Sequence, residues 1–237
     1  MRVFQGKKVM VIGGSRGIGA AIVARFAGEG ADVLFTYAGS TDAAGTVAAE
    51  TGATALCVDA ADRAAMQGAI AAAGPIDIFV FNAGLFVAGD PLELDADAVD
   101  RMIDVNVRAA YHAAVAAART MPQGGRILFV GSVNGDRVPF AGLAAYAMTK
   151  SALQGLARGL ARDFGPLGIT VNVIQPGPTD TDMNPADGPL AGQMHGVMAI
   201  KRHGTAGEVA GLAAFLAGAD AGGITGALHT IDGGFGA

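Results

Sequence analysis

Short runs of apolar residues alternate along the chain with longer, alanine-rich amphipathic segments. The apolar runs lie at residues 8–13, 32–37, 54–58, 76–82, 126–132, 169–175 and 227–232. Most of these runs are unbroken, as expected for parallel strands that helices cover on both faces. The pattern therefore predicts an α/β protein built on a parallel sheet of about seven strands.

The amphipathic segments between the runs predict helices. These segments lie near residues 17–29, 41–51, 62–73, 96–121, 144–164 and 206–218. Each has a length suited to a right-handed crossover, so we expect a Rossmann-type, doubly wound sheet with helices on both faces. No linker or repeat interrupts the series, which predicts a single domain over residues 1–237. Residues 184–196 are rich in proline and glycine and too long for an ordinary connection, so we expect a mobile substrate cover at residues 184–200.

Composition and charge exclude several classes of partner. The chain has 237 residues, of which 51% are hydrophobic and 16% charged, enough for one large core. A net charge of -5 and scattered basic residues disfavour a nucleic-acid polymer or a membrane surface as partner. The single cysteine, Cys57, rules out a disulfide framework and is expected to be buried in a strand. The sequence shows no export signal and no membrane span, so we expect a cytoplasmic protein.

The glycine-rich stretch GGSRGIG joins the first predicted strand to the first predicted helix. Gly13, Gly17 and Gly19 lack Cβ atoms, so the backbone there can approach a pyrophosphate closely. The helix N-terminus adds free N–H groups and the positive end of its dipole. The spacing differs from G-x-G-x-x-G, the common dinucleotide fingerprint, so the loop alone fits either a phosphate site or an ordinary turn.

The second predicted strand indicates which nicotinamide coenzyme such a loop would bind. A carboxylate that binds the free 2′-hydroxyl of NAD belongs at the carboxyl end of this strand, but Asp32 lies at its other end. Arg16 could instead face a 2′-phosphate, together with Thr36, Tyr37 and Ser40. These residues favour NADP over NAD, although Arg16 could also be a solvated loop residue.

Four polar residues are candidates for catalysis. Tyr146 and Lys150 lie one helical turn apart, so we expect the ammonium group to lower the pKa of the phenol and make it a proton donor near neutral pH. Ser132 follows the fifth predicted strand, where it can hold a carbonyl oxygen. Asn106 is a poor helix former in an apolar neighbourhood, and it either binds a water that links to Lys150 or merely packs.

These motifs, with FNAG at 81–84 and PGPTDTDM at 176–183, resemble the short-chain dehydrogenase/reductase family over essentially the whole chain. The resemblance implies hydride transfer between NADP(H) and a carbonyl or secondary alcohol, with Ser132, Tyr146, Lys150 and Asn106 as a catalytic tetrad. It also implies that Tyr146 is the general acid/base and that Lys150 bonds the nicotinamide ribose.

The residues assigned to the coenzyme, from the loop argument and the resemblance together, are Gly13, Ser15, Arg16, Gly17, Ile18, Gly19, Thr36, Tyr37, Ser40, Asp59, Ala60, Asn82, Ala83, Gly84, Tyr146, Lys150, Pro176, Gly177, Thr179 and Thr181. Ser132, Asn134 and Met183 are assigned to the substrate. The four histidines show no ligand spacing, so we expect no metal site. The apolar end of the sequence favours a homotetramer, as is common in this family, or else a dimer.

Several longer stretches resemble one branch of the family, the bacterial cyclic-di-GMP-binding biofilm dispersal mediators. They are FTYAGS, GSVNGDR, GLARDFGP, IKRHG and HTIDGGFGA. This resemblance raises a second hypothesis, a signalling protein that binds cyclic di-GMP in the same groove as NADP, since both ligands need N–H groups for phosphates and a face for a base. Retention of Ser132 and Tyr146 favours the enzyme, because a pure binding protein would not need them.

Overall fold

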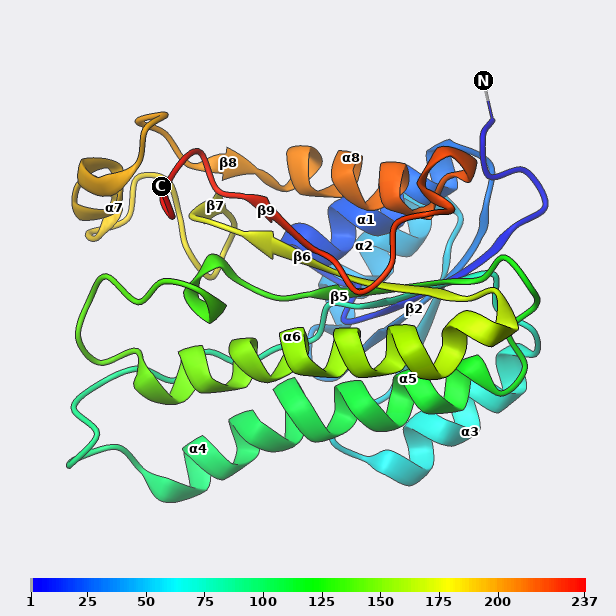
Figure 1. The fold of residues 1–237 in the computed structure, drawn as a ribbon, viewed down its shortest axis with the longest axis horizontal. Coiled ribbons are helices and arrows are strands. Elements are labelled where there is room, and N and C mark those ends of the chain that lie inside the picture. The colour runs from blue at the N-terminus through cyan, green and yellow to red at the C-terminus, as the bar shows by residue number, and fades with distance from the viewer. Residues whose placement is uncertain (1) are drawn as a thin grey trace.

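Seven parallel strands form the central sheet of the computed structural model, which describes residues 2–237 (Figure 1). The strands are β1 (Lys8–Ile12), β2 (Asp32–Tyr37), β3 (Thr54–Cys57), β4 (Ile78–Phe81), β5 (Arg126–Val130), β6 (Thr170–Pro176) and β9 (Leu228–Ile231). They lie in the order β3-β2-β1-β4-β5-β6-β9, and every neighbouring pair is parallel. The predicted α/β class and doubly wound sheet are confirmed.

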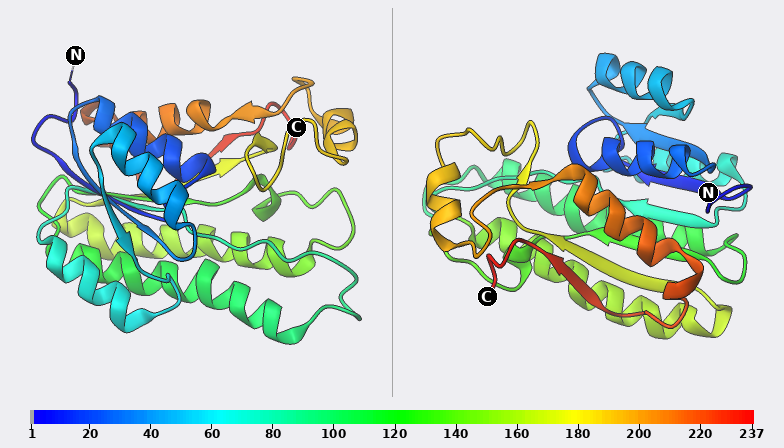
Figure 2. Two further views of the ribbon diagram at one scale, coloured as in Figure 1. Left: turned by 180° about the vertical axis from the view of Figure 1, so that it is seen from behind. Right: turned by 90° about the horizontal axis from the view of Figure 1, so that it is seen from above.

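Helices cover both faces of this sheet. They are α1 (Gly17–Gly28), α2 (Thr41–Thr51), α3 (Arg63–Ala73), α4 (Ala96–Ile103), α5 (Ala110–Ala118), α6 (Ala144–Phe164), α7 (Ala191–Val197) and α8 (Ala206–Ala217). Helices α1, α2 and α8 lie on one face, and α3 to α6 lie on the other (Figures 1 and 2). A π-helical turn, Asp104–Ala109, joins α4 to α5, so the predicted helix at 96–121 contains a distortion that the sequence pattern does not indicate.

The two-sided cover explains why the strand sequences are unbroken apolar runs. In β1, Met10 and Ile12 belong to the core beneath α3, α5 and α6, whereas Val9 and Val11 pack against α1 and α8. All four side chains are fully buried. Successive strand residues point to opposite faces, so a strand with two covered faces needs apolar residues at every position.

The topology places a crevice at the carboxyl end of β1. From β1 the chain proceeds outward to β2 and β3, and then returns to place β4 on the other side of β1. The helices that follow β1 and β4 therefore diverge at this point, which is where open α/β sheets bind ligands. Ile12 pairs with Thr36 of β2 and with Phe81 of β4, so the ends of all three strands meet there.

One expectation, the burial of Cys57, is wrong, and another, the cover at residues 184–200, is not tested. Cys57 is exposed, not buried, because it ends β3, the edge strand of the sheet. The expected cover at residues 184–200 contains a helix, α7, and its neighbour Met198 packs against Val133 and Phe235. His195 of α7 is hydrogen-bonded to His203 across 2.8 Å, which ties this helix to the chain before β8 (Gly204–Thr205). Whether the segment moves stays a prediction.

The described residues contain no helix that is both long and apolar enough to cross a bilayer. The predicted tetramer is not tested by this structure. Its own chain covers the apolar end in part, since Phe235 is 3% exposed and packs against Val133 and Met198, whereas β9 is only half-buried at the edge of the sheet.

Candidate active site

A cleft with about 300 Å³ of water-accessible space opens at the carboxyl ends of β1, β2, β4 and β5. The predicted residues that line it are Gly13, Ser15, Arg16, Gly17, Ile18, Thr36, Tyr37, Ser40, Asp59, Ala60, Asn82, Ala83, Gly84, Tyr146, Lys150, Thr181 and Met183. One cleft therefore joins the glycine-rich loop to the Tyr146 and Lys150 pair, although more than 120 residues separate them in the sequence.

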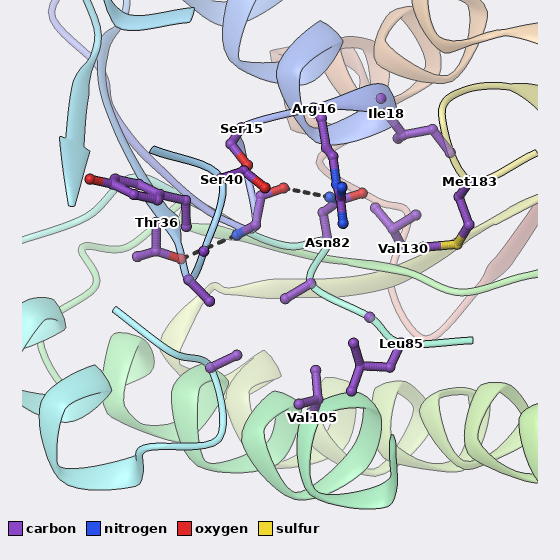
Figure 3. Close-up of a pocket in the computed structure, with 18 of the residues that line it drawn as sticks. Ser15, Arg16, Ile18, Thr36, Ser40, Asn82, Leu85, Val105, Val130 and Met183 are labelled. Atoms are coloured by element: carbon purple, nitrogen blue, oxygen red, sulfur yellow. Dashed lines mark hydrogen bonds between the residues drawn. The ribbon is translucent and has the colours of Figure 1, made fainter. Parts of the chain in front are cut away.

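Hydrogen bonds with Thr36 of β2 and with Asn82, which follows β4, hold the glycine-rich loop (Figure 3). Gly13 N donates to the carbonyl oxygen and to Oγ1 of Thr36, each at 3.1 Å, and Asn82 Nδ2 donates to Gly13 O at 2.6 Å. Gly13 has a φ of 81°, in the left-handed region that favours glycine. A Cβ atom on Gly19 would lie only 2.0 Å from Gly13 O, so Gly19 serves close packing of the helix on the loop and does not line the cleft.

The side chains near the end of β2 suit a phosphate group. Arg16 is exposed, and Figure 3 shows Arg16, Ser15 and Ser40 on the same side of the cleft. The cleft residues at this end of β2, Thr36 to Ser40, include no carboxylate. Thr36 differs from its predicted role in part, because it is buried and its Oγ1 accepts the Gly13 N–H. Its hydroxyl therefore braces the loop.

Asp59 and Arg101 close the far end of the cleft as an ion pair. Asp59 Oδ1 also accepts a hydrogen bond from Ala61 N at 3.0 Å. Burial raises the pKa of the Asp59 carboxyl, but the Ala61 N–H and the Arg101 guanidinium outweigh this effect and leave the pKa below its usual value. The sequence analysis missed Arg101, because its position in an amphipathic helix gives no sign that it reaches a residue following β3.

Lys150 is buried beside Tyr146. Its Nζ atom donates a hydrogen bond to Val130 O at 3.1 Å and lies 5.7 Å from the centre of the Tyr146 ring. Burial lowers the pKa of the amine to about 8, because the charged form loses water. The amine lies close to Gly84, since a Cβ atom there would be 3.4 Å from Nζ, at van der Waals contact.

The expected lowering of the Tyr146 pKa is wrong for this state of the protein. Burial raises the pKa of the phenol, and hydrogen bonding with Ser132 opposes this rise only in part. The ring is also packed edge-on against Phe86, with ring centres 4.8 Å apart. Tyr146 therefore keeps its proton at neutral pH, as a proton donor must.

Asn106 does not line the cleft and supports a loop that does. Its Oδ1 atom accepts from Leu85 N at 2.8 Å, and its Nδ2 atom donates to Leu85 O and to Thr149 Oγ1, each at 3.0 Å. The two donated bonds occupy both N–H groups of the side-chain amide, and the third occupies its oxygen. The predicted water contact of Asn106 stays a prediction, and the contacts of its side chain favour the packing alternative.

Five other predicted residues are not among those that line the cleft. They are Ser132, Asn134, Pro176, Gly177 and Thr179. Ser132 is buried and close enough to influence Tyr146, whereas Thr179 Oγ1 donates to Gly177 O at 3.0 Å and stabilises the turn after β6. The lining residues that the sequence analysis missed are Ala38, Gly39, Val58, Leu85, Arg101, Val105, Val130, Gly131 and Asp182. Most of them are glycine or aliphatic residues, which carry no chemical signal in the sequence. Residues 2–237 contain no cluster of three or more histidine, cysteine or acidic side chains suited to a metal ion.

The fold and this cleft define a Rossmann-type nucleotide-binding protein, and comparisons with known proteins identify its family. Residues 12–236 match the family model described as enoyl-(acyl carrier protein) reductase. The chain is 63% identical, over 100% of both sequences, to the cyclic-di-GMP-binding biofilm dispersal mediator protein of Escherichia coli K12.

Solved structures of similar proteins indicate the same family. The crystal structure of BdcA in complex with NADPH has a TM-score of 0.98 at 63% identity and covers 99% of this chain and 96% of that one. A short chain dehydrogenase from Burkholderia cenocepacia J2315, in complex with NADP, has a TM-score of 0.97 at 48% identity, over 99% of this chain and 100% of that one. The chain belongs to the short-chain dehydrogenase/reductase family, as its motifs predict.

The lowered pKa of Lys150 predicts a pH-dependent stability difference between the wild type and Lys150→Met. Below pH 8 the folded protein carries the full cost of burying the charge. Between pH 8 and 10.5 the folded state has released the proton and the unfolded state still holds it, so the wild type gains up to about 3 kcal/mol relative to the variant. Urea unfolding at a series of pH values measures this difference. Lys201→Met, at an exposed lysine, is the control. A stability difference between the wild type and Lys150→Met that does not change with pH would contradict the lowered pKa of Lys150.

Proposed function

We propose that this protein is an NADP(H)-dependent oxidoreductase that transfers hydride between the nicotinamide and a carbonyl or secondary alcohol. The observation that carries the proposal is the single cleft shared by the glycine-rich loop and the Tyr146 and Lys150 pair. Crystal structures of two relatives in complex with NADPH and NADP support the choice of coenzyme.

The residues present fit NADP(H). The backbone of Gly13 and Gly17 leaves space for a pyrophosphate beside the N-terminus of α1. Arg16, Ser15 and Ser40 supply donors for the 2′-phosphate, and the lack of a carboxylate at the end of β2 removes a repulsive charge. Asp59 and Ala60 border the position proposed for the adenine. Thr181 borders the position proposed for the carboxamide. Pro176, Gly177 and Thr179 belong to the turn after β6, which the Thr179 Oγ1 to Gly177 O hydrogen bond stabilises.

Bound NADPH would supply the hydride, and the chain would supply orientation and the proton. Ser132 holds the carbonyl oxygen next to the Tyr146 hydroxyl, which donates its proton to that oxygen as the alcohol forms. Lys150 would donate a hydrogen bond to the ribose of a bound coenzyme, and its ammonium group would stabilise the phenolate that remains on Tyr146. The phenol keeps its proton at neutral pH, so it is in the form that can donate to a carbonyl oxygen.

Substrate contacts are proposed for Asn134 and Met183, and a cover for residues 184–200. Met183 lines the cleft, and Asn134 has a buried Oδ1 atom without a hydrogen-bond partner in the structure, so this acceptor is available to a donor. A homotetramer is proposed for the assembly, with a dimer as the alternative. Exposed Tyr111 on α5 and Met148 on α6 support such an association, since both are large apolar side chains on adjacent helices.

Replacement of Tyr146 by phenylalanine tests the reaction. Tyr146→Phe should lower carbonyl-dependent NADPH oxidation by at least about 100-fold, because only the proton donor is lost. The Kd for NADPH, measured by fluorescence titration, should change less than about twofold, because the ring and its packing on Phe86 remain. Ketones, β-keto esters, quinones and imines form the substrate panel. Turnover comparable to the wild type in this variant would refute the assignment.

Replacement of Arg16 or Tyr37 tests the coenzyme preference. Arg16→Ala removes a guanidinium from the proposed 2′-phosphate site, and Tyr37→Asp adds a repulsive carboxylate there. Each should lower the ratio of NADPH to NADH affinity by about tenfold or more. Arg158→Ala, at an exposed arginine of α6, is the matched control. A ratio that stays at the wild-type value in both variants would exclude this phosphate site.

A second candidate function is binding of cyclic di-GMP in the same cleft. The specific observation in its favour is the name of the 63% identical relative from Escherichia coli. The cleft offers loop N–H groups for a phosphate and the guanidinium groups of Arg16 and Arg101 for a base.

Calorimetric titration of cyclic di-GMP tests this candidate directly. If both ligands use the cleft, the apparent Kd for cyclic di-GMP should rise in proportion to the NADPH concentration. Binding that NADPH does not affect would place cyclic di-GMP elsewhere on the protein, and absence of binding to coenzyme-free protein would remove the candidate.

A further inference from the structure

The Ser132 hydroxyl is held by a short turn that follows β5. Ser132 Oγ accepts a hydrogen bond from Asn134 N at 3.1 Å, and Ser132 O accepts one from Gly135 N at 2.9 Å. Asp136 N donates to Val133 O at 3.0 Å and completes the turn. The direction of the Ser132 side chain therefore depends on the position of this whole turn.

Asp136 ties the turn to two buried glutamines. Its carboxylate accepts one hydrogen bond from Gln154 Nε2 at 2.8 Å and another from Gln175 Nε2. Gln154 Nε2 also donates to Gln175 Oε1 at 2.8 Å, which closes a ring of three side chains. We refer to Asp136, Gln154 and Gln175 as the amide clamp. Gln175 is fully buried in β6 and Gln154 is 8% exposed in α6, so both arms are rigidly placed.

The clamp acts on the helix that carries the proposed proton donor. Tyr146, Lys150 and Gln154 follow one another at intervals of four residues, so they lie along one face of α6. Ser151 adds a second tie, from its Oγ atom to Gly135 O at 2.7 Å. Gly135 lies so close to the helix that a Cβ atom on it would be 2.7 Å from Gln154 Nε2. The turn is therefore fixed to the same helix face as Tyr146.

The chemistry of the clamp requires a carboxylate at position 136. Two amide N–H groups from different elements point at one side chain, and a carboxylate offers an acceptor oxygen to each. An asparagine would present an NH2 group to one of these donors. That donor would then lose its partner inside the protein, where an unsatisfied polar group is costly.

We propose that Asp136 is a positioning residue for catalysis, which holds the Ser132 hydroxyl against the Tyr146 phenol through Gln154 and Gln175. The proposal rests on the proposed function, since it assigns to Ser132 a role in that reaction. Asp136 itself is not among the residues that line the cleft.

Asp136→Asn is the test variant, and Asp163→Asn, in the last turn of the same helix, is the matched control. We expect Asp136→Asn to lower kcat for carbonyl reduction by about 10- to 100-fold, the size expected for a small displacement of a catalytic group. KM and the Kd for NADPH should each change less than about twofold. Asp136→Glu, which keeps both acceptor oxygens, should recover part of kcat, and Asp163→Asn should behave as the wild type.

Non-additivity with Ser132 separates positioning from a general loss of stability. If Asp136 acts through Ser132, the double variant Asp136→Asn, Ser132→Ala should be no slower than Ser132→Ala alone. A further loss of kcat in the double variant, or an unchanged kcat in Asp136→Asn, would overturn the proposal. If Asp136→Asn does not fold, Gln154→Met removes one arm of the clamp and should show the same pattern with a smaller effect.

A measurement without turnover keeps the proposal separate from the proposed function. Ionisation of Tyr146 is followed by the ultraviolet absorbance of its phenolate, assigned by subtracting the signal of Tyr146→Phe. Hydrogen bonding with Ser132 lowers the pKa of this phenol, so Asp136→Asn and Ser132→Ala should raise the pKa by similar amounts. If the wild type reduces no carbonyl compound but this rise is present, the proposed function fails and the positioning role stands. If the pKa of Tyr146 is unchanged in Asp136→Asn, the positioning role fails.

Discussion

The hydrogen bond from the Lys150 amine to the Val130 carbonyl oxygen joins α6 to the carboxyl end of β5, and the geometry of the cleft depends on this junction. The bond crosses the boundary between a helix and the sheet, and it is buried. Buried charge-assisted bonds of this kind are strong and strict in their geometry. The Lys150 to Val130 bond fixes the distance of α6 from the sheet. It therefore also fixes the positions of Tyr146 and Gln154 on the same helix face. The loop after β4 is placed from the same side, because Asn106 holds Leu85 and also bonds Thr149 of α6.

Most of the fold could be predicted from the sequence because both faces of the sheet are covered. Unbroken apolar runs separated by amphipathic helices have few other solutions, and all seven predicted strands are present. Helix bounds were also accurate for 41–51 and 144–164. The π-helical turn at Asp104–Ala109 could not be predicted, because its residues continue the same apolar periodicity. Cys57 was misplaced for a related reason, since a short strand sequence does not reveal that it lies at the edge of the sheet.

The candidate site could be predicted only in part from the sequence. Tyr146, Lys150 and the glycine-rich loop were found from the sequence because their residue types and spacing carry chemistry. The direction of the Tyr146 pKa shift could not be predicted, because it depends on how packing removes water from the phenol, and residue spacing does not show this packing. The amide clamp was missed as well. Asp136, Gln154 and Gln175 come from a turn, a helix and a strand, and only the folded chain brings their side chains together.

The π-helical turn before α5 carries Asn106, which contacts the loop after β4. A turn of this kind contains one more residue than an α-helical turn, so it rotates every later side chain by about 100° relative to an uninterrupted helix. In this protein the extra residue lets Asn106 reach the backbone of Leu85 while the apolar stripe of α5 still faces the sheet. A single insertion, with no change in residue type, can thus couple two segments without loss of the core. Loss of that residue in a related chain would leave the loop after β4 without its amide contact even if an asparagine were retained.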